Sequence, residues 1–153
     1  MPNTYSQLHV QIIFAVKERH SIIKETQRIA VEKYICGIVN NNNCKPLAIY
    51  CNPDHIHLLI GLHPTVAVAN IVRDIKASSS KYIKDKLDNP FFSWQDGYAA
   101  FSYSRGQINQ VIRYILKQPK HHSDTHFKDE LIAIYTKYGI EFDEKYLFDW
   151  IDL

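Results

Sequence analysis

The stretch Asp54-His55-Ile56-His57-Leu58-Leu59-Ile60 places one apolar residue between two histidines and follows them with an apolar run. In a β-strand, successive side chains point to opposite faces of the sheet. His55 and His57 would then share one face, while Ile56 would point into the core. Two imidazoles side by side on a strand provide half of the ligands of a metal site. The stretch therefore predicts a core strand that carries half of a metal site.

Three further segments have the pattern of strands. Apolar residues recur at every second position between residues 5 and 16, which is typical of a half-buried strand. Residues 45–51 form a short apolar run, and Asn52-Pro53-Asp54 has turn chemistry. Residues 55–62 would therefore be the second strand of a hairpin. A fourth strand is predicted at residues 98–103.

Apolar residues at helical spacing mark four helices. The first is predicted from about residue 25 to 39, where an asparagine tract ends it. The second is long and ends at Asn89-Pro90. The third starts at Ser104-Arg105-Gly106-Gln107, which has the form of a capping box, and ends near Pro119. The fourth would cover residues 125–138.

The order of these elements is strand, helix, strand, strand, helix, strand, followed by helices. This is the order of a ferredoxin-like plait. The predicted fold class is α+β, with a four-stranded antiparallel sheet, two long helices on one face and additional C-terminal helices. A chain of 153 residues suits one core, so residues 1–153 are expected to form a single domain. The acidic, aromatic segment 140–153 predicts no element.

Composition narrows the class of protein. Hydrophobic residues make up 46% of the chain and charged residues 22%, as in ordinary soluble domains. No apolar run approaches the ~20 residues that span a membrane, and the N-terminus lacks the pattern of a secretory signal. The three cysteines have no zinc-site spacing and indicate reduced thiols in a cytoplasmic protein. They are Cys36, Cys44 and Cys51.

Charge is unevenly distributed along the chain. The net charge is +2, but the segment after Ser123 holds eight acidic and three basic side chains, so the basic excess lies before it. A basic excess fits a polyanionic partner such as nucleic acid. A solvated surface without such a partner explains the charge equally well.

Tyr114 and Gln118 are four residues apart and so lie on one side of the third predicted helix. They flank its apolar stripe and could face an adjoining site while the stripe packs on the core. The carbonyl oxygen of Gln118 could ligate a hard cation. Together with His55 and His57 it would leave positions open for water and substrate. Each signal alone is weak, because a tyrosine at helical spacing usually serves packing.

Four motifs together resemble the single-tyrosine HUH transposases, which include the insertion-sequence two-hundred type and the REP-associated tyrosine transposases. The motifs are Pro53-Asp54-His55-Ile56-His57-Leu58-Leu59, Ile75-Lys76-Ala77-Ser78-Ser79-Ser80, Trp94-Gln95-Asp96-Gly97-Tyr98-Ala99-Ala100-Phe101-Ser102 and Val111-Ile112-Arg113-Tyr114-Ile115-Leu116-Lys117-Gln118. They follow the family's order and roughly its spacing, and the resemblance covers residues 5 to about 130. His121-His122 follows Lys120, where relatives commonly have an acidic residue, so these histidines are not assigned as ligands.

The resemblance implies a bacterial or archaeal transposase that cleaves and rejoins single-stranded DNA at hairpin-flanked ends. Tyr114 would be the nucleophile, and its attack would leave a 5′-phosphotyrosine and a free 3′-OH. His55, His57 and Gln118 would hold one Mg²⁺ or Mn²⁺. The whole chain would be one catalytic domain of a mobile element's enzyme.

The resemblance also implies partners. Insertion-sequence relatives are dimers in which the tyrosine helix of one subunit serves the histidines of the other, whereas REP-associated relatives can work as monomers. A homodimer acting in trans is expected here, because the chain is short and lacks further domains. Six side chains are candidates for contacts to the DNA backbone. They are Lys76, Lys81, Lys84, Arg105, Arg113 and Lys120.

Two other functions fit the same residues. A non-catalytic or domesticated plait could bind nucleic acid through its sheet, although the aromatic strand motifs of RNA-recognition domains are missing from the sequence. A metal-dependent phosphodiesterase could use water in place of tyrosine, but Tyr114 would then be partly redundant. The first alternative predicts metal-independent binding without cleavage, and the second predicts cleavage products without a protein link.

Overall fold

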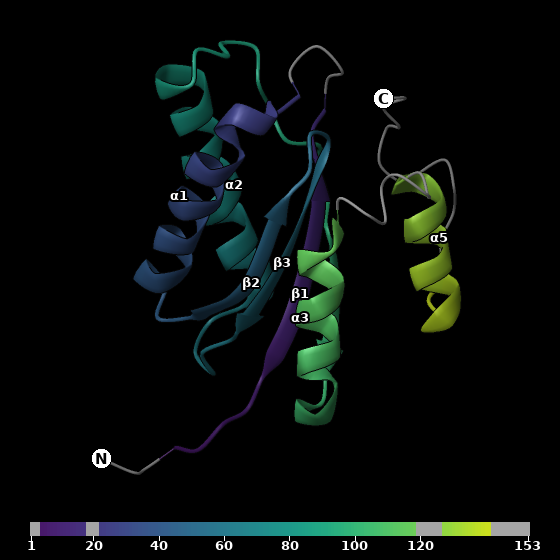
Figure 1. The fold of residues 1–153 in the computed structure, drawn as a ribbon. Helices are drawn as coiled ribbons and strands as arrows, with labels where there is room; N and C mark the ends of the chain where they lie inside the picture. Colours follow the sequence, from purple (N-terminus) through teal and green to yellow (C-terminus); the bar gives the residue numbers. More distant parts are fainter. Residues whose placement is uncertain (1–3, 18–21, 119–126, 142–153) are drawn as a thin grey trace.

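The computed structural model describes residues 4–17, 22–118 and 127–141. Four antiparallel strands form one sheet in the order β2-β3-β1-β4 (Figure 1). This confirms the predicted α+β class and the four-stranded antiparallel sheet. The strands are β1 (His9–Ala15), β2 (Lys45–Cys51), β3 (His55–Gly61) and β4 (Ala99–Tyr103).

The two central strands carry the core. Ile12 and Phe14 of β1 and Ile56 and Leu58 of β3 point to the same face of the sheet and are fully buried. The register places Ile13 opposite His57 and Ala15 opposite His55. From His55 to Ile60 every residue of β3 is buried, because both faces of the sheet are covered.

Two long helices cover the first face, as predicted. The 3-10 turn η2 (Glu25–Gln27) leads directly into α1 (Arg28–Asn41), and α2 (Val68–Lys86) follows β3. Apolar residues at helical spacing bury one side of each helix against the sheet. Representative members of this core are Val31, Ile35, Ile71 and Ile75.

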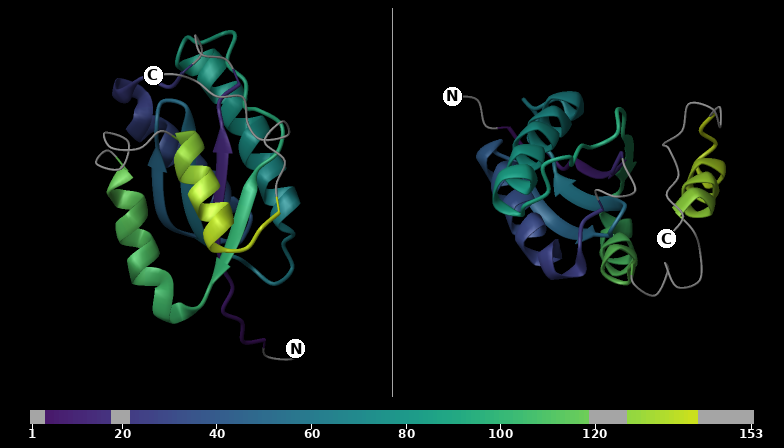
Figure 2. Two further views of the ribbon diagram at one scale, coloured as in Figure 1. Left: turned by 90° about the vertical axis from the view of Figure 1, so that its right-hand side faces the viewer. Right: turned by 90° about the horizontal axis from the view of Figure 1, so that it is seen from above.

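The remaining helices cover the opposite face (Figure 2). The 3-10 turn η3 (Arg105–Gln107) opens α3 (Ile108–Leu116), and α5 is Phe127–Lys137. The predicted capping box is present, with the Ser104 amide donating to Gln107 Oε1 at 3.0 Å. In α3, Val111 and Ile115 pack on Ala48 and Leu59.

Helix α5 packs on the other half of this face. Leu131 is fully buried against Ile13, Ala99 and Phe101, which belong to β1 and β4. Helices α3 and α5 therefore enclose the face of β3 to which His55 and His57 point.

The limits of β1 and α1 differ from those expected. Strand β1 begins at His9 and not at residue 5, because His9 pairs with Gly61 and Tyr103, where β3 and β4 reach their ends. Helix α1 continues to Asn41 before Asn43 adopts a positive φ of 61°. Lys120, His121-His122 and residues 142–153 lie outside the described residues.

The structure also describes the cysteines and the hydrophobicity of the helices. Cys36, Cys44 and Cys51 are free thiols, and the last two are buried. In the three described segments, no helix combines the length and the hydrophobicity needed to cross a membrane.

Candidate active site

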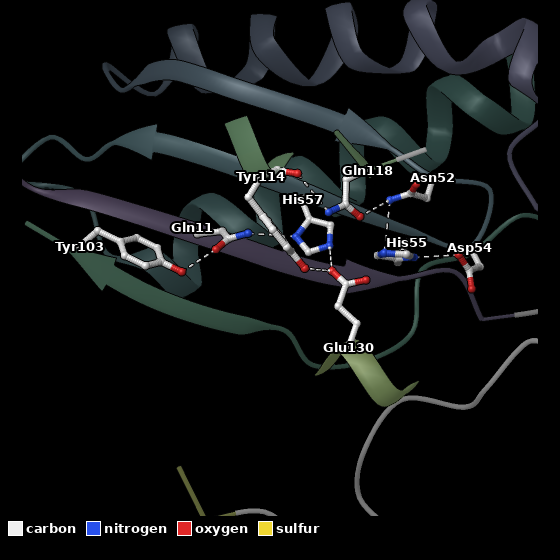
Figure 3. A network of polar contacts seen from close by, with 9 residues as sticks. All are labelled: Gln11, Asn52, Asp54, His55, His57, Tyr103, Tyr114, Gln118 and Glu130. Carbon is white, nitrogen blue, oxygen red and sulfur yellow. Dashed lines mark hydrogen bonds and ion pairs between the residues drawn. The ribbon is translucent and has the colours of Figure 1, made fainter. Parts of the chain in front are cut away.

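His55 and His57 lie in the middle of a buried polar network between the sheet and helices α3 and α5 (Figure 3). Both are fully buried, and their ring centroids are 5.2 Å apart. Alternation along β3 places them on one face, while Ile56 points to the opposite core. Buried polar groups need partners, and each imidazole has a separate set.

His55 is held from both sides of its ring. Its Nδ1 lies 2.7 Å from the carboxylate oxygen Oδ1 of Asp54, so Nδ1 carries the proton and donates it there. The Asn52 amide nitrogen donates to Nε2 at 3.2 Å. A carboxylate that orients one ring nitrogen is usual at metal-binding histidines, and an ion at Nε2 would take the place of the Asn52 N–H.

His57 is oriented by a different chain of hydrogen bonds. The Tyr103 hydroxyl donates to Gln11 Oε1 at 2.7 Å, and the Gln11 amide nitrogen lies 2.9 Å from His57 Nδ1. The first bond fixes which end of the Gln11 amide faces the imidazole. The second nitrogen of His57, Nε2, lies 2.9 Å from Glu130 Oε1.

Tyr114 approaches the histidines from α3. Its ring centroid is 5.8 Å from that of His57, and its hydroxyl donates to the Glu130 carboxylate. Burial and the Glu130 charge raise the pKa of Tyr114 above its ordinary value, while a side-chain hydrogen bond with Gln118 acts in the opposite direction. The phenol is therefore neutral at physiological pH.

Gln118 lies just beyond α3 and is fully buried. Its Oε1 accepts a hydrogen bond of 3.2 Å from Asn52, the same amide nitrogen that contacts His55 Nε2. The structure thus brings His55, His57, Tyr114 and Gln118 together within a single chain. The trans arrangement expected from the resemblance is not needed to assemble these four residues.

Glu130 is a site residue that the sequence patterns did not reveal. It projects from α5, is buried, and contacts both His57 and Tyr114. In the sequence it is one of eight acidic residues after Ser123. One signal was present: Glu130 lies four positions before Ile134 and so shares the inward side of α5.

The site can hold a divalent cation. One ligand atom each from His55, His57 and Glu130 lies within 4.8 Å of the others. Bonds of about 2.0–2.2 Å to one ion would bring these atoms to within about 4.4 Å of each other, so a small inward shift would complete the site. In the described part of the chain, His57 Nε2 is buried without a well-aligned hydrogen bond, although a carboxylate oxygen is 2.9 Å away. Because the Gln11 amide nitrogen faces Nδ1, a neutral His57 ring carries its proton on Nε2, and a cation between Nε2 and Glu130 would replace that proton.

The predicted DNA-contact residues fall on both sides of the molecule. Lys81 and Lys84 are exposed on α2, across the sheet from the histidines, while Arg105 and Arg113 are exposed on the side of α3. Lys76 is half-buried and donates to the carbonyl oxygens of Gln95 and Gly97 at 2.9 and 2.6 Å. Its ammonium group therefore fastens the loop before β4.

The aromatic residues of the loop before β4 include both buried and exposed side chains. Phe92 and Trp94 are buried and pack edge-to-face with each other, and Trp94 also packs against Phe14. Phe91 remains 75% exposed. Of these three rings, only Phe91 could stack on a base without leaving the core.

Comparison with known proteins gives a consistent result. The family model described as "Transposase IS200 like" matches residues 4–118. The ISDra2 transposase TnpA of Deinococcus radiodurans is 25% identical over 119 residues, covering 73% of this chain and 84% of that protein. The transposase for insertion sequence element IS200 of Salmonella typhimurium is 25% identical over 117 residues, covering 71% and 77%.

A solved structure supports the fold. A REP-associated tyrosine transposase, solved bound to a REP hairpin, superimposes with a TM-score of 0.60 at 18% identity. The match covers 80% of this chain and 73% of that one.

Proposed function

Because the chain belongs to the family of IS200-like transposases, we propose that it cleaves and rejoins single-stranded DNA by attack of the Tyr114 hydroxyl on a phosphodiester. The general function of the family is DNA transposition, and the proposal concerns the chemistry. The observation that carries it is the position of Tyr114. Its hydroxyl and the His57 ring meet on one carboxylate in a buried site.

The proposed step balances without an external energy source. The Tyr114 oxygen bonds to phosphorus, the bond from phosphorus to the 3′ oxygen breaks, and the leaving oxygen takes up a proton as a 3′-OH. The phosphodiester is retained as a 5′-phosphotyrosine, which a 3′-OH can attack in reverse. The phenol proton has an acceptor in place, because the hydroxyl already donates to Glu130.

The position of the Tyr114 hydroxyl must account for much of the rate of the proposed attack. A phenol is a poor nucleophile below its pKa of ~10, and here that pKa is raised further. The packing of α3 on the sheet holds the hydroxyl at a fixed point beside the histidines, which lowers the entropic part of the barrier. Removal of water by α3 and α5 strengthens every charge interaction within the site.

We propose that His55 and His57 hold one Mg²⁺ or Mn²⁺, with Gln118 and Glu130 as the two candidate oxygen ligands. A bound divalent cation would neutralise charge on the scissile phosphate. Asp54 and Gln11 orient the two imidazoles from behind. The position of Glu130 adds a carboxylate to the set expected from sequence, and either metal is compatible with such ligands.

The proposed substrate is a single strand flanked by hairpins. The REP-associated relative was solved with a REP hairpin, which supports a similar partner for this chain. Arg105 and Arg113 are the candidates on the side of the active site, and Lys81 and Lys84 would contact DNA only where it extends around the molecule. A homodimer that exchanges tyrosine helices, as the resemblance implies, is the alternative to this single-chain site, and it would require α3 to leave the position seen here.

The decisive experiment replaces the nucleophile. Wild-type protein incubated with Mn²⁺ and single-stranded DNA from the sequences flanking its gene should form a covalent adduct stable to denaturing electrophoresis. Tyr114→Phe should form no adduct while binding the same DNA with unchanged affinity. Tyr34→Phe, which alters a tyrosine of α1 on the other side of the sheet, is the matched control and should still form the adduct.

Two results would contradict the proposal. An adduct in Tyr114→Phe would show that another residue is the nucleophile. Cleavage by both proteins without any adduct would indicate attack by water and hence a phosphodiesterase.

A further inference from the structure

A cavity of about 380 Å³ adjoins the candidate active site. It lies between α3 and α5, over the sheet at Gln11 and Tyr103. Tyr114 and Glu130 form part of its wall. A molecule inside the cavity would therefore touch the residue that carries out the proposed attack.

The size of the cavity suits one nucleotide. Pockets for small molecules and cofactors begin at about 300 Å³, so the space exceeds what water alone would need and is too small for a folded segment. An extended strand that brings its phosphate to Tyr114 has to place the neighbouring nucleotide within a few ångströms of that phosphate. The cavity is a recess at that position, partly open to solvent.

The wall favours a base over a phosphate. Asp129 and Glu130 contribute two carboxylates to it, against one lysine, Lys137. A phosphate would be repelled by this balance, whereas the amino groups of a base can donate to carboxylates. Lys137 lies on the exposed last turn of α5, where it could meet the backbone outside.

Aromatic rings and an exposed side-chain amide complete the chemistry of the wall. Tyr103 and Tyr138 line the cavity and pack edge-to-face at 6.1 Å, which offers aromatic surface for stacking. Gln110 also lines it and is exposed. A side-chain amide presents a donor and an acceptor together, the pair that reads one edge of a base.

We propose that the cavity between α3 and α5 binds one unstacked nucleobase of single-stranded DNA, next to the scissile phosphate. The inference rests on the proposed function and adds a specificity pocket to it. Part of the wall comes from α5, which lies beyond residues 4–118 matched by the family model. The pocket would give the proposed cleavage a base preference.

The experiment uses a pool of single-stranded DNA with randomised bases, incubated with the full chain and Mn²⁺. Covalent adducts are isolated and sequenced, and base frequencies are read on both sides of the cut. Wild-type protein should show a preference at one position beside the cut. Gln110→Ala should reduce that preference roughly tenfold, the typical effect of losing one bidentate base contact. Asn109→Ala, an exposed neighbour outside the cavity, should leave it unchanged.

A second variant fills the space. Ala133→Trp places a large ring in the cavity and should reduce adduct formation at least about tenfold or erase the preference. Thr136→Trp, exposed on the same helix and outside the cavity wall, is its control and should behave as wild type.

The outcomes separate the two proposals. Absence of adducts with wild-type protein would contradict the proposed function itself. Wild-type adducts whose base preference is the same in Gln110→Ala and Ala133→Trp would contradict the pocket alone. An equal loss in Thr136→Trp and Ala133→Trp would also contradict it, because the effect would then belong to α5 and not to the cavity.

Discussion

Glu130 links Tyr114 to His57 through one carboxylate. Its Oε1 accepts from the Tyr114 hydroxyl and lies 2.9 Å from His57 Nε2. A buried carboxylate is costly unless it is paired, and here two polar groups surround it. The same oxygen would be a strong ligand for a hard cation. In the proposed reaction Glu130 could therefore either accept the proton of Tyr114 or bind the metal ion.

The identity of the third ligand can be measured. Glu130→Gln keeps the shape of the side chain but removes its charge, so we expect Mn²⁺ affinity to fall by about tenfold or more in isothermal titration. Gln118→Leu should have a smaller effect, because Gln118 Oε1 is neutral and already accepts a hydrogen bond from Asn52. Asp129→Asn, an exposed neighbour on α5, is the control for the change in charge.

The opposite ranking would restore the ligand set expected from sequence. If Gln118→Leu abolishes Mn²⁺ binding and Glu130→Gln binds as wild type, then the glutamine is the ligand and Glu130 serves only Tyr114. Thermal unfolding of each variant in the absence of metal would show whether its core is intact.

Local periodicity is enough to predict which site residues share a face of a strand or a side of a helix. His55 and His57 share a face because strand side chains alternate, and Tyr114 and Gln118 share a side because a helix repeats every 3.6 residues. Both statements need only the neighbouring residues. Glu130 belongs to a separate helix, and its entry into the site depends on how Leu131 packs on the sheet. That contact is tertiary and has no local pattern.

The distinction between local pattern and tertiary packing also applies to the helices and strands. The strands, the long helices and the capping box at Ser104 were recognisable from periodicity and turn chemistry, whereas the face taken by the C-terminal helices was not. Ile13, Ala15 and Ala99 show why. Small and medium apolar residues on the outer side of a strand indicate a covered face, but they do not identify the helix that covers it.

Docking of α5 should depend on Leu131. Truncation to alanine removes a fully buried side chain from contact with Ile13 and Phe101, at a cost of about 2–5 kcal/mol. Because α5 carries Glu130, we expect faster hydrogen exchange in α5 together with weaker Mn²⁺ binding, while α1 and α2 keep their protection. Thr136→Ala, exposed on the same helix, should change neither. Uniform loss of protection across the chain would mean that α5 is part of the global folding unit.

At the scale of the molecule, the two faces of the sheet differ in chemistry. One face carries the apolar core under α1 and α2, and the other holds the polar network under α3 and α5. The family match ends at residue 118, and α5, which helps to enclose the site, lies beyond it. The four site residues predicted from the sequence lie together within one chain. They are His55, His57, Tyr114 and Gln118.

This arrangement predicts a result for mixed subunits. Tyr114→Phe lacks the nucleophile and His57→Gln lacks a ligand, so each alone should form no adduct with single-stranded DNA from the flanking sequences. If each tyrosine serves its own histidines, mixing the two variants restores nothing, because every site keeps one defect. If the helices are exchanged in a dimer, about a quarter of the sites in an equal mixture combine an intact tyrosine with intact histidines. We expect no recovery, because α3 packs on its own β2 and β3. Adduct formation near a quarter of the wild-type level would instead establish the exchanged dimer.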